Sequence, residues 1–527
     1  MTDFHKIVLY ALDVARSLGA SYADARFVAQ KSEGIDTFME RLTGAGVDET
    51  FSVGVRVLYK GAFGFASAAG LGKRAVETAV RKAIEIAKIS AKVNKHPIEL
   101  APEPAHRGSW SAPCSIDPFS IPTETKVGLL LEAEKIMTKQ RGVKITSGSM
   151  CFTREHKIFG NTDGTLVEQT FITTGVGMDA TAFDDQGLHQ VRSWPNSFGG
   201  QYELGGWEVV QKWDLLGNAA RVAEEAVMVS RAPLCPEMTT DLIIGASQVS
   251  LQIHESIGHA LESDRVLGRE INYAGGSFAQ PHMLGNFRYG SKLVNVAADA
   301  TIPGALGSYK WDDEGVLGQR IPLIENGILT GYLTSRQTAQ ELRLARSGGM
   351  MRAQSGEYTP MIRMTNVSLA PGQDGTLEDI IANTKSGIYL DMNYSWSIDD
   401  LRHNFQFGCE VGWLIKNGKR AGVVRNPNYW GITQDFWRKC VAVGSSSDWL
   451  VWGIPSCGKG QPSQDGHVGH GASPCKFRNV QVGLAIPPDL ANKGGSRKRR
   501  SGRNNVSARS NRFVHHHHGH NGSKHCC

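Results

Sequence analysis

Two histidines and a glutamate lie together in the short segment His254-Glu255-Ser256-Ile257-Gly258-His259. Neutral imidazole is a good zinc ligand, and a carboxylate beside a metal-activated water can accept a proton from it. This combination of residue types is the one that zinc enzymes use to hydrolyse peptide bonds. The spacing is H-E-x-x-x-H, which is one residue longer than the more familiar H-E-x-x-H.

The longer spacing has a geometric consequence. An ideal helix turns about 100° per residue, so two residues five apart lie about 140° apart around the axis. A straight helix therefore cannot direct both His254 and His259 at one ion. A π-type turn, which pairs residues five apart, or a break at Gly258 would bring them together, and we expect such a distortion here. The alternative is a regular helix with two unrelated histidines, one in the core and one on the surface.

A catalytic zinc site usually has three protein ligands and one open position. The third ligand must come from elsewhere in the chain. Glu262 could reach the ion or accept the second ring N–H of a ligand histidine, and Cys457, in a loop rich in glycine and proline, has a lysine nearby that would favour the thiolate. His467 and His470 also lie in a glycine-containing segment. Chemistry alone leaves these four residues open.

Several separated motifs carry a resemblance to a known family. They are the run from His254 to Arg265, the segment Asp312 to Val316 followed by Ile324 to Leu333, the stretch Met361 to Asn366, and Cys457 to Gln461. Together they resemble the TldD/PmbA family of metallopeptidases, over about residues 5 to 485 and in the family's order. The resemblance is to the subunit that carries H-E-x-x-x-H, since a related subunit lacks that motif.

The resemblance implies a zinc peptidase. His254, His259 and Cys457 would bind one zinc ion, and Glu255 would be the general base. Glu262 and His470 would then support the ligands or face the substrate. The family also implies peptides or unfolded segments as substrates, and a dimer formed with itself or with the related subunit that lacks the motif.

Composition places the chain among ordinary globular proteins. It has 527 residues, of which 41% are hydrophobic and 20% charged, enough for two or three domains with a sizeable core. No apolar run is long enough for a membrane helix, and the first residues do not resemble a secretory signal. Nine widely spaced cysteines indicate reduced thiols. We therefore expect a cytoplasmic protein.

The net charge of +6 is unevenly distributed. Residues 487–527 hold nine Lys/Arg and one acidic residue, a net charge of +8, so the rest of the chain carries −2. Such basic runs are usually solvated and disordered, and nucleic-acid binding is the less favoured interpretation. The histidines in this tail would bind metal only adventitiously.

Hydrophobic periodicity predicts an α+β fold, with antiparallel strands and flanking helices in the N-terminal part and a largely β catalytic domain that carries the metal helix. The predicted divisions are 1–96, a Pro-rich linker at 97–122, a second α+β subdomain at 123–232, the metallopeptidase domain at 233–486, and the tail at 487–527. Predicted helices span about 4–20, 73–91, 124–139 (with Thr123 as N-cap) and 208–231.

Turn signals locate the hairpins. Residues 51–57 and 63–66 should pair around Lys60-Gly61, and a second hairpin should turn at Asp163-Gly164. Strands at 143–146 and 150–153 should be separated by a break at Ser147-Gly148. In the catalytic region, residues 241–246 should form a buried strand that leads into the metal helix, with Asn-Gly turns at 326–327 and 417–418. Arg363 and Asn366 are interpreted as ordinary strand residues.

The leading interpretation is thus a zinc peptidase. The alternative is a non-catalytic subunit that binds peptides and holds a structural metal. Four protein ligands would favour the structural metal, and three ligands with an open position would favour catalysis.

Overall fold

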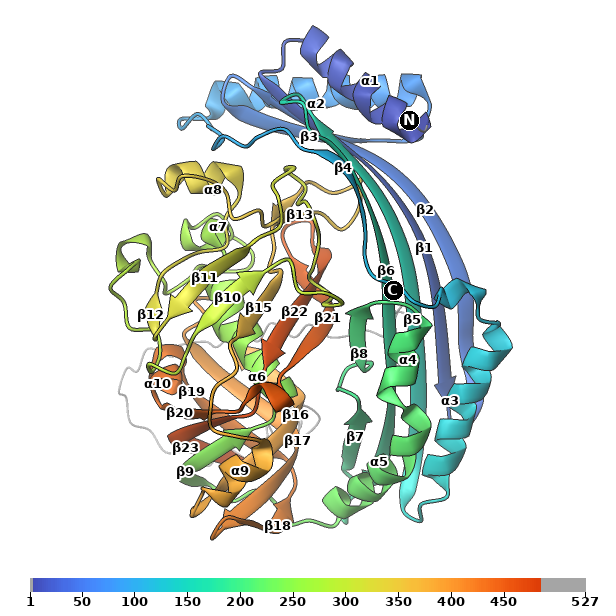
Figure 1. The fold of residues 1–527 in the computed structure, drawn as a ribbon, viewed down its shortest axis with the longest axis vertical. Coiled ribbons are helices and arrows are strands. Elements are labelled where there is room, and N and C mark those ends of the chain that lie inside the picture. Colours follow the sequence, from blue (N-terminus) through green and yellow to red (C-terminus); the bar gives the residue numbers. More distant parts are fainter. Residues whose placement is uncertain (1–2, 485–527) are drawn as a thin grey trace, which may run out of the picture.

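The molecule has two halves, an arched N-terminal sheet and a compact C-terminal domain that lies against its inner side (Figure 1). The computed structural model describes residues 3–484, so the predicted basic tail lies outside the described residues. The fold is mixed α and β, as predicted, with a largely antiparallel sheet in the N-terminal half and a β-rich C-terminal region.

The N-terminal half is built on one eight-stranded sheet. Its strands run in the order β3-β2-β1-β5-β6-β4, and β7 and β8 both pair with β6. The strands are β1 (Tyr22–Phe38), β2 (Arg41–Tyr59), β3 (Ala62–Ala68), β4 (Arg107–Ser111), β5 (Val143–Asn161), β6 (Leu166–Phe183), β7 (His189–Trp194) and β8 (Gln201–Leu204). The helices are α1 (Asp3–Ser17), α2 (Lys73–Val93), α3 (Thr123–Thr138), α4 (Trp207–Trp213) and α5 (Leu215–Ser230).

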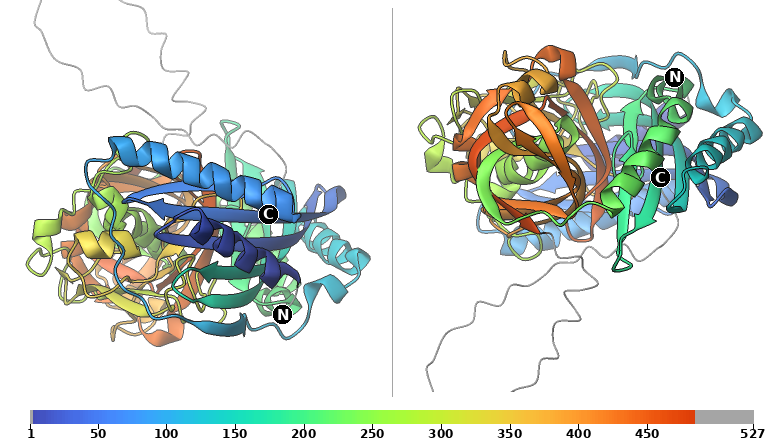
Figure 2. Two further views of the ribbon diagram at one scale, coloured as in Figure 1. Left: turned by 90° about the horizontal axis from the view of Figure 1, so that it is seen from above. Right: turned by 90° about the horizontal axis from the view of Figure 1, so that it is seen from below.

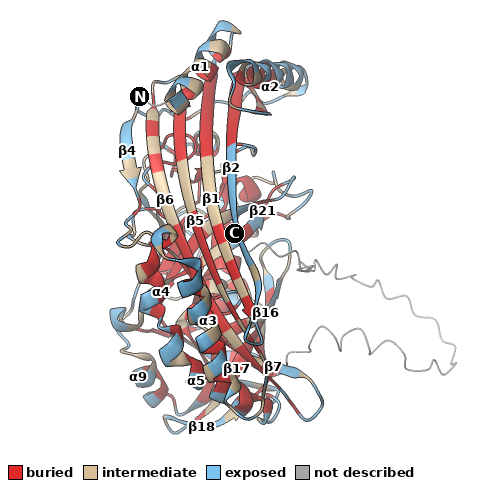
Figure 3. Cartoon of the chain, turned by 90° about the vertical axis from the view of Figure 1, so that its right-hand side faces the viewer, coloured by how far each residue is buried: buried red, intermediate tan, exposed pale blue. Residues whose placement is uncertain are grey.

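Alternation along the strands explains why the sheet is covered on both faces. On β1, Ala23, Ala25 and Phe27 pack with α1 and α2, whereas Asp24 and Arg26 point to the opposite face. There Arg26 donates to the carbonyl of Tyr358 in the C-terminal domain, and Asp24 pairs with Arg56 of β2, which also pairs with Glu314 of that domain. Further along the sheet the outer face is covered by α3, α4 and α5, seen in front of the strands in Figure 3. Viewed from above, α1 and α2 lie side by side across one end of the sheet (Figure 2, left). The long strands are therefore buried on both faces of the sheet, which a period-two pattern alone does not reveal.

Several local predictions for this half are wrong. Strand β5 runs without a break through Ser147-Gly148, because β1 and β6 pair with it on both sides. The Pro-rich segment contains a regular strand, β4, parallel to β6. The helix predicted at 208–231 is broken at Asp214, whose backbone is left-handed (φ 38°). Helix α3 begins at Thr123, with Pro122 as its N-cap and no capping side chain.

The C-terminal half contains a barrel. Strands β16, β9, β23, β19 and β17 pair in sequence, and β17 pairs back with β16, which closes the ring seen from below in Figure 2 (right). A second sheet has the order β12-β11-β10-β15-β22-β21. The predicted Asn-Gly hairpins are present, since Asn326-Gly327 joins β11 to β12 and Asn417-Gly418 joins β17 to β18, with positive φ at all four residues.

The strands of this half are β9 (Met238–Ile244), β10 (Val296–Asp299), β11 (Arg320–Glu325), β12 (Ile328–Leu329), β13 (Met351–Arg352), β14 (Met361–Ile362), β15 (Asn366–Leu369), β16 (Ser386–Ile398), β17 (Asn404–Lys416), β18 (Lys419–Val424), β19 (Pro427–Ile432), β20 (Cys440–Val443), β21 (Leu450–Lys459), β22 (Gln464–Ala472) and β23 (Cys475–Leu484). Its helices are α6 (Ala246–Ile253), α7 (Ser263–Val266), α8 (Arg336–Glu341), α9 (Leu377–Ala382) and α10 (Thr433–Arg438). Among residues 3–484, no helix combines the length and apolar character needed to cross a bilayer.

Helix α6 packs against the barrel wall. Its apolar residues Val249 and Ile253 belong to the largest hydrophobic core of the protein. Its buried Gln248 and Gln252 both hydrogen-bond to the hydroxyl of Tyr429 on β19, at 3.0 Å each. The helix that ends at His254 is therefore fixed on both its apolar and its polar side.

Candidate metal centre

The histidine segment is a π-helical turn. Strand β9 leads through Gly245 into α6, and the turn His254–Gly258 follows directly. The N–H of His259 donates to the carbonyl of His254, five residues back. The two rings lie 4.7 Å apart between centroids, so the predicted distortion is confirmed and the regular-helix alternative is wrong.

Gly258 does not break the helix, which is the second distortion that the sequence allows. Its dihedral angles (φ −55°, ψ −65°) are ordinary helical values, so unusual backbone freedom is not what the position requires. A Cβ atom at Gly258 would instead overlap the sulfur of Met364. The glycine is needed because the turn packs closely against Met364.

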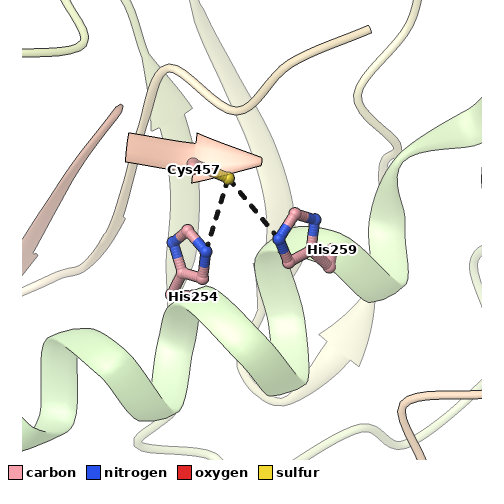
Figure 4. Close-up of side chains that lie close together, drawn as sticks. All are labelled: His254, His259 and Cys457. Atoms are coloured by element: carbon pink, nitrogen blue, oxygen red, sulfur yellow. Dashed lines mark hydrogen bonds between the residues drawn. The ribbon is translucent and has the colours of Figure 1, made fainter. Parts of the chain in front are cut away.

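Cys457 completes a group of three donor atoms. It lies on β21, at an irregularity of the β21–β22 pairing between Ile454 and Cys457, and not in the loop that its glycine and proline neighbours predict. Its Sγ lies 3.5 Å from Nε2 of His254 and 3.5 Å from Nε2 of His259 (Figure 4). All three side chains are buried. Among the histidine, cysteine and acidic side chains of residues 3–484, they form the one group of three close enough together to hold a metal ion.

These distances fit zinc. Zn–N bonds of about 2.0–2.1 Å and a Zn–S bond of about 2.3 Å in tetrahedral geometry separate N and S by about 3.5 Å. Burial alone would favour the neutral thiol, but His254, Arg363 and His259 together lower the pKa of Cys457 well below its usual value. These neighbours therefore favour the thiolate, which is the form that binds metal.

Hydrogen bonds fix the orientation of both histidine rings. His470 donates from Nδ1 to the carbonyl of Val367 (2.9 Å), and burial lowers its pKa well below the usual value, so its Nε2 is an acceptor. His254 Nδ1, 2.8 Å away, must then be the donor. Its other nitrogen, Nε2, faces Cys457 and is the ring atom open to a metal ion. His470 thus orients the ring of His254 and is not itself in the donor group.

Glu262 supports the other histidine. Its Oε2 lies 2.9 Å from Nδ1 of His259, which leaves Nε2 of that ring free for the ion. Lys459, fully buried, lies 3.2 Å from the same carboxylate and donates to both oxygens of Asp264 at 2.9 Å. The sequence allowed Glu262 either to reach the ion or to accept a ring N–H from a histidine. In the structure it accepts the Nδ1–H of His259.

Glu255 faces an arginine that the sequence gives no reason to select. Nη1 of Arg402 lies 2.7 Å from Oε2 of Glu255. Arg402 comes from the turn between β16 and β17, in the left-handed region (φ 63°), and is 147 residues away in sequence. Within the described chain, Oε1 of Glu255 receives no hydrogen bond, so one carboxylate oxygen is held and the other is available to a reactant.

The remaining sequence candidates lie outside the donor group. His467 is three residues from His470 on β22 and therefore points to the opposite face, where burial lowers its pKa to about 4. Arg363 is buried with its guanidinium against the carbonyl of Cys457, so it supports the cysteine. Asn366 bonds to Gly307, Asp299 and Ser308 and is structural, as expected.

Comparisons with known proteins agree on one family. Residues 23–87, 116–232 and 237–483 match domain 1, the central domain and the C-terminal domain of the PmbA/TldA metallopeptidases. A metalloprotease of Methanocaldococcus jannaschii is 31% identical over 414 residues, which cover 79% of this chain and 87% of the relative. A metalloprotease TldD homolog of Haemophilus influenzae is 29% identical over 375 residues, covering 70% and 74%.

Solved structures share the fold. A putative modulator of DNA gyrase from Thermotoga maritima has a TM-score of 0.72 at 18% identity, with 91% of this chain and all of that chain covered. TldE from Thermococcus kodakarensis has a TM-score of 0.67 at 16% identity, covering 92% and 100%. At these identities the likeness concerns the architecture alone.

Proposed function

The chain belongs to the TldD/PmbA family of metallopeptidases, and from that premise we propose that it is a zinc-dependent peptidase with Glu255 as general base. The observation that carries the proposal is the convergence of His254 Nε2, His259 Nε2 and Cys457 Sγ at the separation expected for tetrahedral zinc. A relative from Saccharolobus solfataricus, 30% identical over 193 residues, is named a zinc metalloprotease TldD homolog.

In the proposed reaction the protein groups have separate tasks. When bound by His254, His259 and Cys457, zinc would supply Lewis acidity, which polarises a peptide carbonyl and lowers the pKa of water. Glu255 would accept the proton of the attacking water at Oε1 and pass it to the nitrogen of the leaving amine. Arg402 would hold the other oxygen of Glu255 and so fix the orientation of the carboxylate.

The described residues supply three donors and no fourth. Three protein ligands leave a position for water or substrate, which favours catalysis over a structural metal. We further propose peptides or unfolded segments as substrates, and a dimer formed with a second copy or with a relative lacking the motif. Light scattering of the chain alone and mixed with such a relative tests the assembly.

The central test is Glu255→Gln in protein lacking residues 487–527, whose histidines would bind stray metal. The near-isosteric amide cannot accept a proton, so the variant should keep about one zinc per chain while peptide hydrolysis falls roughly 100-fold to 10,000-fold. Mass spectrometry of a peptide digest measures the rate, and elemental analysis measures the metal. Equal rates for variant and parent would exclude Glu255 as the base.

A further inference from the structure

Part of β2 is an open edge of the N-terminal sheet. Strand β3 pairs with β2 only from Val53 to Tyr59, and β1 pairs with the other side of β2. Residues 45–51 therefore have a strand on one side and, within residues 3–484, none on the other. All seven are exposed, and the stretch appears in pale blue at one edge of the sheet (Figure 3). We call residues 45–51 the open edge.

The hairpin geometry shows which backbone groups of the open edge face outward. The two-residue turn after Tyr59 makes Tyr59 and Ala62 a hydrogen-bonded pair, so odd-numbered residues of β2 direct their N–H and C=O groups toward β3. This alternation continues without a register shift as far as Ala45. The odd-numbered residues of the open edge therefore present N–H and C=O groups that no strand among the described residues pairs.

The side chains of the open edge are apolar and acidic. Val47 is 60% exposed and Phe51 54%, although exposed edges usually carry lysine or proline, and this stretch contains neither. Within the described chain, Asp48 forms no ion pair, and Glu49 pairs only with Lys31, at 3.0 Å on the surface. The open edge therefore fits an extended segment with apolar and basic side chains.

The acidic residues disfavour a second copy of the chain as the partner strand. A two-fold antiparallel pairing of the open edge with itself is centred near Asp48. It would place Asp48 and Glu49 of one copy against the same residues of the other, and like charges that face each other destabilise a strand pair. A partner with positive charge is favoured.

The chain itself contains a segment of this kind. Residues 503–518 are the longest stretch beyond Leu484 without glycine or proline, and they include no acidic residue. Their basic and apolar side chains include Arg503, Arg509, Arg512, Val506, Phe513 and Val514. The 18 residues between Leu484 and Arg503 can extend to about 60 Å, which is about the diameter of a compact chain of this length.

We propose that residues 505–514 add to the open edge of β2 as an extra strand of the same chain. Backbone pairing satisfies the outward N–H and C=O groups of the open edge. The arginines of the segment neutralise Asp48 and Glu49, and its apolar side chains cover Val47 and Phe51. The proposal does not depend on the peptidase reaction.

Hydrogen–deuterium exchange of the full chain, read by mass spectrometry with fragmentation to single residues, tests this docking. Ser510→Pro places a residue without an N–H inside the segment and should prevent it from pairing as a strand. The outward amides of Val47, Glu49 and Phe51 should exchange at least about 10-fold more slowly in the parent than in this variant. Ser501→Pro, outside the segment, is the matched control and should exchange like the parent.

A variant of the open edge provides an independent test. Val47→Pro removes an outward N–H and no hydrogen bond to β1, so the protein should still fold, as circular dichroism can verify. The amides of Glu49 and Phe51 should lose their protection in this variant too. Equal exchange of the open edge in the parent and in Ser510→Pro would overturn the proposal. Protection that rises with protein concentration would also overturn it, because the added strand would then come from a second copy.

Discussion

The two histidines proposed as zinc ligands are supported by acceptors of different kinds. His259 donates to a carboxylate, that of Glu262, whereas His254 donates to the neutral ring of His470. An anionic acceptor raises the basicity of the ring more than a neutral one, and losing such a supporting group typically lowers metal affinity 10-fold to 100-fold. The loss of a ligand itself should cost more than the loss of either support.

Comparing Cys457→Ser with His470→Ala tests this order. The serine variant lacks the thiolate and should lose zinc far more readily, while the alanine variant keeps all three donors and should weaken binding about 10-fold to 100-fold. Competition with a fluorescent chelator, on protein without residues 487–527, gives both affinities. Greater zinc loss from His470→Ala than from Cys457→Ser would reverse the assignment of ligand and support.

Lys459 is the most deeply buried cation of the site, and its charge compensates both Glu262 and Asp264. Lys459→Met keeps the length of the side chain but leaves two buried carboxylates short of a partner, which costs about 3–5 kcal/mol of unfolding free energy. Lys212→Met is the matched control, since that lysine is half-exposed beside Glu203 and its pair contributes about 0–1 kcal/mol. Urea unfolding of the zinc-free proteins measures both changes, and equal losses would contradict the role of Lys459.

At the scale of elements, residue spacing predicts some features well and others not at all. The five-residue interval between His254 and His259 requires a π-type turn if the rings share an ion, and that turn is present. Asn-Gly pairs identified two hairpins for a similarly local reason. The strand character of Cys457 could not be predicted, because β21 is stabilised by pairing with β22 and not by its own glycines and prolines.

The contact between Gly258 and Met364 makes the packing of the π turn testable. Gly258→Ala should lower the unfolding free energy by about 1–3 kcal/mol, because the added methyl group overlaps the methionine sulfur. Gly128→Ala in α3 is the control, since open space surrounds that helical glycine and alanine should stabilise it by up to about 1 kcal/mol. The cost at Gly258 should shrink in a Met364→Ala background; an unchanged cost there would show that the overlap is not its cause.

At the scale of the whole molecule, contacts distant in sequence decide the arrangement. The two predicted N-terminal subdomains share one sheet, because β1 pairs with both β2 and β5. Ion pairs then join this sheet to the C-terminal half, for example Arg56 of β2 with Glu314. Sequence periodicity predicts that such strands exist but contains no information on which strands pair. For the same reason the sequence could not predict that Arg402 lies beside Glu255.

Glu410 of β17 makes the junction between the halves sensitive to pH. Its carboxylate accepts from Ser193 and Arg192 of β7, yet burial outweighs these contacts and raises its pKa to about 7. A carboxyl with a raised pKa holds its proton more tightly in the folded state than in the unfolded chain. The contribution of Glu410 to the free energy of unfolding is therefore fully present below about pH 4.5, and it is lost as the pH rises to about 7 and beyond.

The parent should accordingly lose on the order of 3 kcal/mol of unfolding free energy between pH 5 and pH 8 through this one group. In Glu410→Gln the side chain cannot titrate, so this part of the pH dependence of stability should disappear. The substitution also removes the ion pair with Arg192, but that loss of stability does not change the slope with pH. Urea unfolding at several pH values measures both curves, and only the difference in their slopes is compared. Asp48→Asn, at an exposed strand position, should keep the slope of the parent. Parallel curves for the parent and Glu410→Gln would mean that Glu410 ionises normally, and burial at the junction would then not control its charge.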